Sequence, residues 1–209
     1  MGATLKGFSI VVFVPAIMYF AISWVFMGRA DGLMAFYVIL YSLMLMVSMR
    51  YSQTQPLLGL DIGWKYIRTE PWLLLGGLVL WVLMLPWVLF VKEMMDIAEA
   101  TVLFSPVPVV LEKYGLFGAV MTFGLAPIAE EYFFRHFLYG NLANRMAPFA
   151  AALISSVVYG LSHTHLLLIG SMFVVGMVQC FFYERVRALS LVIFTNIVLQ
   201  ILLSFMTKI

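Results

Sequence analysis

Charged residues are scarce in this chain of 209 residues. Only 11% of the residues are Asp, Glu, Lys or Arg, whereas 64% are hydrophobic, and so little charge cannot cover the surface of a water-soluble protein. The formal net charge is +2 and the basic residues are dispersed, so no nucleic-acid partner is expected. The single cysteine, Cys180, excludes a disulfide within the chain, and its apolar surroundings favour a buried structural thiol.

Several intramembrane chemistries lack the residues that they need. The chain has three histidines and no His-Glu-x-x-His, which argues against a zinc protease and leaves no metal expected. The aspartates, Asp31, Asp61 and Asp96, lie in polar connections, so an aspartyl site inside the membrane has no pair of carboxylates. The sequence around Ser162 only partly matches the Gly-x-Ser-Gly setting of a rhomboid-type serine nucleophile.

Long apolar segments account for most of the chain. Each is close to the roughly 17 to 25 residues that span a bilayer as a helix. They cover about residues 8–27, 33–49, 72–91, 116–142, 148–162, 166–183 and 188–206. Pro86 is expected to kink the third segment, and residues 93–114 are expected to form either a short interfacial helix or a cap over a site.

The segments predict an all-α, polytopic membrane protein with about seven transmembrane helices. The connections are short and the sequence shows no internal repeat, so residues 1–209 are predicted to form a single membrane domain. The chain begins Met1-Gly2 without a transit peptide, and we therefore expect a multi-pass protein of a prokaryotic plasma membrane.

Two adjacent carboxylates interrupt the fourth segment. Glu130 and Glu131 are followed by Arg135, and a charge at the centre of a membrane helix costs roughly 2.5 to 3.5 kcal/mol on insertion scales. Glu131 and Arg135 are four residues apart, so they share a helix face and can form an ion pair, whereas Glu130 is rotated by about 100°. One carboxylate is therefore interpreted as structural and the other as available for general base catalysis, the alternative being an ion network that only fixes helix packing.

Polar side chains also recur at helical spacing in two later segments. Tyr159 and His163 are four residues apart, so they can face the same partner, while His136 and His165 are better candidates for a purely interfacial role. In the last segment, Asn196 and Gln200 are again four apart. Their amides can bond to neighbouring helices, or they can donate to the oxyanion of a scissile peptide bond.

The ordered set of these motifs, within about residues 116–202, resembles the CAAX protease and bacteriocin-processing (CPBP, Abi) family of glutamic intramembrane proteases. The resemblance implies a core like that of the CAAX prenyl endopeptidases, a glutamate-activated water, no cofactor, and a membrane-associated peptide or protein as substrate. It implies catalytic roles for Glu130, His163 and Asn196. The supporting residues it implies are Glu131, Arg135, Tyr159 and Gln200.

The polar pair of the last segment departs from the family pattern. The family has His-x-x-x-Asn or Asp there, whereas this chain has Asn196 and Gln200, which can donate hydrogen bonds but cannot titrate. Two alternatives to a protease therefore stay open. One is a non-catalytic scaffold or regulator on the same fold, and the other is an ion-coupled transporter, although no half-chain repeat supports the latter.

Overall fold

The computed structural model describes residues 30–51, 75–94, 107–163, 166–186 and 189–206, and among these residues there are helices but no strands. The predicted all-α class is confirmed over these residues. The first predicted helix, at about 8–27, lies outside the described residues.

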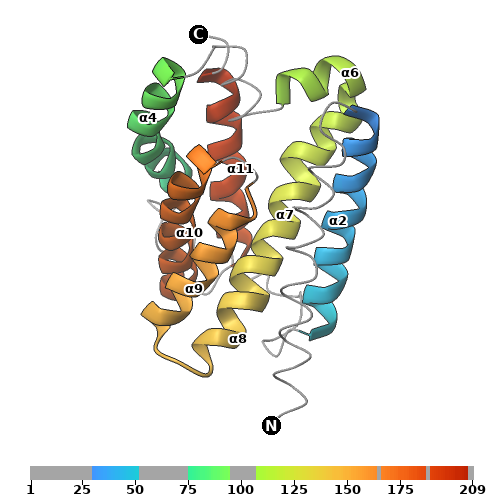
Figure 1. Cartoon of the computed structure of the whole chain (residues 1–209). Coiled ribbons are helices and arrows are strands. Elements are labelled where there is room, and N and C mark those ends of the chain that lie inside the picture. The colour runs from blue at the N-terminus through green and yellow to red at the C-terminus, as the bar shows by residue number, and fades with distance from the viewer. Residues whose placement is uncertain (1–29, 52–74, 95–106, 164–165, 187–188, 207–209) are drawn as a thin grey trace.

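Within the described residues, two helices precede the one that carries the polar cluster, and they form where apolar segments were predicted. α2 covers Ala30–Tyr51 and α4 covers Gly76–Met94. Pro86 lies inside α4, and the helix continues on both sides of it. Figure 1 shows α2 and α4 on opposite sides of the molecule, with the helix that carries the carboxylates between them.

The central helix, which carries the two carboxylates, begins earlier than expected and contains irregular turns. α6 (Val107–Val120) bends at Gly115, whose φ of 53° is a left-handed conformation that glycine adopts without strain. Beyond the bend, the central helix comprises η3 (Met121–Leu125), α7 (Ala126–Glu131), η4 (Tyr132–Tyr139) and α8 (Gly140–Ala143). Residues 107–114 of the predicted cap or interfacial segment are therefore helical, whereas 95–106 lie outside the described residues.

Three further helices complete the described fold. They are α9 (Pro148–Leu161), α10 (Leu166–Val186) and α11 (Leu189–Met206), and each matches a predicted segment to within a few residues. α9 packs against α10, and α11 packs against α4 and α7. The carboxylates of α7 therefore lie where α2, α11 and the central helix come together (Figure 1).

Glycines allow α9 and α10 to approach closely. A Cβ added at Gly160 would lie 2.7 Å from the carbonyl oxygen of Ile169, and one added at Gly176 would lie 3.0 Å from the Cβ of Ser156. Small residues at such positions let helix backbones approach in membrane proteins. Gly170, also in α10, has open space where its Cβ would be.

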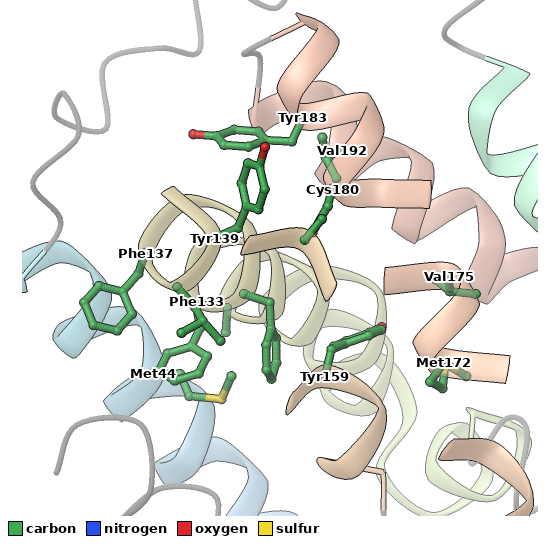
Figure 2. Close-up of a cluster of buried hydrophobic side chains, with 14 of the residues drawn as sticks. Met44, Phe133, Phe137, Tyr139, Tyr159, Met172, Val175, Cys180, Tyr183 and Val192 are labelled. Carbon is green, nitrogen blue, oxygen red and sulfur yellow. The ribbon is translucent and has the colours of Figure 1, made fainter. Parts of the chain in front are cut away.

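A hydrophobic core surrounds the central helix. Figure 2 shows Phe133, Phe137 and Met44 on one side of the cluster and Tyr139 beside Tyr183 on another. Cys180 is buried in this cluster with 1% of its surface exposed, in agreement with the expected structural thiol.

Hydropathy by itself identifies fewer spans than the sequence predicts. Among the described residues, one helical stretch, Ile169–Val186, is long and apolar enough to cross a bilayer alone. Val38–Ser48, Pro148–Leu161 and Leu189–Leu202 are shorter apolar helices. The number of seven transmembrane helices therefore stays a prediction.

Candidate active site

The two carboxylates lie on α7, a single regular stretch between π-helical segments. η3 precedes α7 and η4 follows it, and π-helical turns inside helices are frequent at functional sites. Glu131 is completely buried, whereas Glu130 is partly buried. The neighbouring side chains thus have different environments, as their rotation around the helix requires.

Both carboxylate oxygens of Glu131 contact polar side chains. Its Oε2 lies 3.1 Å from Nε of Arg135, which is the ion pair expected from their spacing. Its Oε1 accepts a hydrogen bond of 2.7 Å from Nδ2 of Asn196 on α11. Because neither Glu131 nor Arg135 is exposed, their charges are compensated inside the protein.

Arg135 connects this pair to two more helices. Its Nη2 donates a hydrogen bond to Oε1 of Gln179 on α10, and its guanidinium carbon lies 4.2 Å from the ring centroid of Tyr159 on α9. Gln179 is fully buried and was not predicted as a site residue. The signal for it in the sequence is a single amide within an apolar helix.

Glu130 has a different set of partners. Its Oε1 accepts a hydrogen bond of 3.2 Å from the hydroxyl of Tyr41 on α2. Asn196 and Tyr159 are also close enough to interact with this carboxylate, and the charge of Arg135 acts on it from a distance. The hydroxyl that donates to Glu130 is thus a neutral phenol, whereas Glu131 is paired with a guanidinium.

His163 lies just beyond the end of α9 and packs on Tyr159. Their rings are in a T-shaped arrangement with centroids 5.0 Å apart, and Nδ1 of His163 lies 3.0 Å from the carbonyl oxygen of Tyr159. No hydrogen bond joins His163 directly to Glu130 in the described part of the chain. Tyr159 interacts with both of them.

The two polar residues of the last helix have different environments. Asn196 is buried and directs its amide to Glu131, while Gln200, one turn further along α11, is partly buried. The predicted oxyanion role of Asn196 thus has a competing partner in the structure. It stays a prediction, as does that of Gln200.

The remaining histidines lie away from the carboxylates or outside the described residues. Nδ1 of His136 lies 3.0 Å from the hydroxyl of Tyr183, and His165 is outside the described residues. Close to His136, Tyr139 donates a hydrogen bond to Glu184. No group of three or more His, Cys, Asp or Glu residues that could hold a metal ion is found within the ranges that the structure describes.

Comparison with known proteins supports the resemblance inferred from the motifs. A protein of Bacillus subtilis (strain 168) with the name "Putative membrane peptidase YdiL" is 35% identical over 79 residues, which cover 36% of this chain and 31% of that protein. The chain thus aligns with less than a third of that relative's length. No solved structure was found to match.

A family match covers the whole candidate site except Tyr41. Residues 112–202 match the family described as "Type II CAAX prenyl endopeptidase Rce1-like". This range contains both carboxylates, Arg135, His163 and Asn196, and it confirms the resemblance predicted from the sequence. Residues 112–202, somewhat less than half of the chain, are therefore similar to this family.

Proposed function

We propose that this protein is a glutamic-type intramembrane endopeptidase, independent of metals and cofactors, that hydrolyses a peptide bond of a membrane-associated peptide or protein. One observation carries the proposal. The adjacent carboxylates have different partners, since Glu131 is neutralised by Arg135 whereas Glu130 is bonded to the neutral hydroxyl of Tyr41. A pair of carboxylates in different environments is the arrangement that separates a structural role from a basic one.

In the proposed reaction, Glu130 removes a proton from a water molecule, and the resulting hydroxide attacks the carbonyl carbon of the scissile bond. The carbon–oxygen bond forms as the electrons of the carbonyl move to its oxygen. When the tetrahedral intermediate collapses, the carbon–nitrogen bond breaks and the proton held by Glu130 passes to the leaving nitrogen. No covalent acyl-enzyme is formed, and one water is consumed for each bond that is cut.

His163 and Tyr159 are proposed to assist at the same water. Tyr159 interacts with Glu130 and also contacts the ring of His163, so the three groups are close to one another. In apo structures, catalytic hydrogen bonds are often formed only when the substrate binds. The separation of His163 from Glu130 is therefore compatible with a shared role.

Asn196 and Gln200 are proposed to stabilise the oxyanion. The amide nitrogen of Asn196 carries two hydrogens, and one of them is donated to Glu131. The second can be donated to the carbonyl oxygen as negative charge develops on it. Removing one donor of this kind typically reduces kcat by about 100- to 1000-fold.

The similarities to known proteins also support a proposal about location. The family name and the relative's name both indicate a membrane protein, and the relative is bacterial. We propose a multi-pass protein in the plasma membrane of a prokaryote. In this setting the lipid bilayer surrounds the exposed apolar side chains, and the substrate reaches Glu130 within the membrane.

A second candidate is a regulator on the same fold that binds membrane proteins without cutting them. The observation that favours it is the use of Asn196 to hold Glu131, at the position where the family has a histidine. A regulator should function with a glutamine at position 130, because no proton is removed there.

The experiment compares the termini of membrane proteins in cells that carry the wild-type protein or Glu130→Gln at equal expression. Glu184→Gln is the matched control, since Glu184 also accepts a hydrogen bond from a tyrosine, Tyr139, in another part of the fold. Termini that appear with the wild type and with Glu184→Gln, but vanish with Glu130→Gln, identify a protease. Unchanged termini in cells whose phenotype depends on the protein refute the protease and favour the regulator.

A further inference from the structure

Tyr41 reaches the carboxylate that the reaction uses, although it lies outside the family-like range of 112–202. It is on α2, which packs against α7 and η4. The inner face of α2 is defined by the buried residues Leu40, Met44 and Ser48, and Tyr41 packs against the core beside them. Its ring is therefore anchored by packing, and its hydroxyl projects to Glu130.

The other buried polar side chain on this face does not reach another helix. Ser48 donates to the carbonyl oxygen of Met44, one turn earlier in α2, at 2.6 Å. Tyr41 instead donates to a residue 89 positions away in the sequence. The polar atom of Tyr41 is thus a tertiary contact, and its partner is the one carboxylate of α7 that has no ion pair within 4.0 Å in the described structure.

The neutral hydroxyl of Tyr41 is a suitable hydrogen-bond partner for a carboxylate that acts as a base. A carboxylate held by a cation is a weaker base than one held by a neutral hydroxyl, because an ion pair stabilises the charged form more strongly. A phenol can still fix the rotation of the carboxylate. An oriented base is needed because small displacements of reacting groups cost large factors in rate.

We infer that Tyr41 is a positioning residue for the reaction: its hydroxyl holds one oxygen of Glu130 so that the carboxylate is directed to the attacking water. This inference rests on the proposed function. It extends the catalytic unit beyond the family-like range to a helix near the start of the chain. Tyr41 itself is not proposed to touch the substrate.

The first test uses the rate at which new membrane-protein termini appear after induction. Tyr41→Phe removes the hydroxyl and keeps the ring, so the packing of α2 is preserved. We expect the rate to fall about tenfold or more, which corresponds to the loss of a hydrogen bond to a charged group. Tyr139→Phe is the control, because it removes another tyrosine–glutamate hydrogen bond, with Glu184, and should leave the rate within about twofold.

The second test does not depend on a substrate. The infrared carboxyl band of Glu130 is assigned in purified protein as the band that Glu130→Gln removes. Tyr41→Phe should move this band, since the carboxyl loses a hydrogen bond, whereas Tyr139→Phe should not. A merely structural role of Tyr41 would leave the band in place while lowering the yield of folded protein.

The outcomes separate this inference from the proposed function. A slower rate together with a moved band supports Tyr41 as a positioning residue. A wild-type rate or an unmoved band in Tyr41→Phe overturns it, even if Glu130→Gln abolishes cleavage. If Glu130→Gln leaves every terminus unchanged, the protease itself is refuted and the role of Tyr41 in proteolysis is overturned with it.

Discussion

Replacing Arg135 with methionine removes the cation that neutralises Glu131 and keeps much of the side-chain volume. Arg135 and Glu131 are 3.1 Å apart and have no more than 1% of their side-chain surface exposed. The variant would leave an unpaired carboxylate inside the bundle. Breaking a buried pair in this way destabilises a protein by about 3 to 5 kcal/mol.

The loss of stability is measurable as a change in melting temperature. For a chain of this length, 1 kcal/mol changes the melting temperature by roughly 2 to 4 °C, so Arg135→Met should melt about 6 to 20 °C lower than the wild type. The assay is thermal unfolding in detergent micelles, followed by the fluorescence of the five tryptophans. Arg185→Met is the control, since Arg185 is exposed and its loss should have little effect.

A double variant distinguishes charge from packing. Glu131→Gln combined with Arg135→Met removes both charges and leaves a neutral amide beside Asn196. We expect the double variant to be more stable than Arg135→Met alone, because no buried charge is left unpaired. Equal melting temperatures for the single and the double variant would refute the reasoning, and an Arg135→Met protein as stable and active as the wild type would refute it completely.

Two further predictions concern the packing around the site. Gly160→Ala should destabilise the protein by about 1 to 3 kcal/mol, since its Cβ would lie 2.7 Å from the carbonyl oxygen of Ile169. Gly170→Ala, where the Cβ meets nothing within 4 Å, should be neutral or slightly stabilising in the same melting assay, and the reverse order would contradict the close approach of α9 and α10. Gln179→Leu should cost about 1 to 3 kcal/mol, because Nη1 of Arg135 already has no hydrogen-bond partner among the described residues and a further guanidinium nitrogen would lose its own. Met177→Leu on the same helix should cost less than about 1.5 kcal/mol, and equal losses for these two variants would argue against a role of the amide.

The features that the sequence predicted correctly are those with a local physical cause. The helix positions follow from the contrast between apolar segments and polar connections, and the described helices, apart from the early start of α6, lie where that contrast placed them. The Glu131–Arg135 ion pair follows from residues four apart on one helix. Neither depends on how the helices pack against one another.

The features that were not predicted depend on tertiary packing. The partner of Asn196 is 65 residues away, and hydropathy and spacing cannot choose between Glu131 and a substrate carbonyl. Gln179 is a single amide within an apolar helix, and Tyr41 resembles the tyrosines that commonly lie at membrane interfaces. The π-helical turns on either side of α7 also have no signal in the residues that form them.

The ion pair within the central helix has a consequence for biosynthesis. In the proposed multi-pass protein, Gln179 enters the membrane after the carboxylates, because it is 44 residues after Arg135 in the chain. At that moment Glu131 and Arg135 can compensate each other within one helical turn, which lowers the cost of inserting them. The nascent segment can therefore be inserted with its two charges already paired. The later helices then pack against this ion pair and add its hydrogen bonds with Gln179 and Asn196.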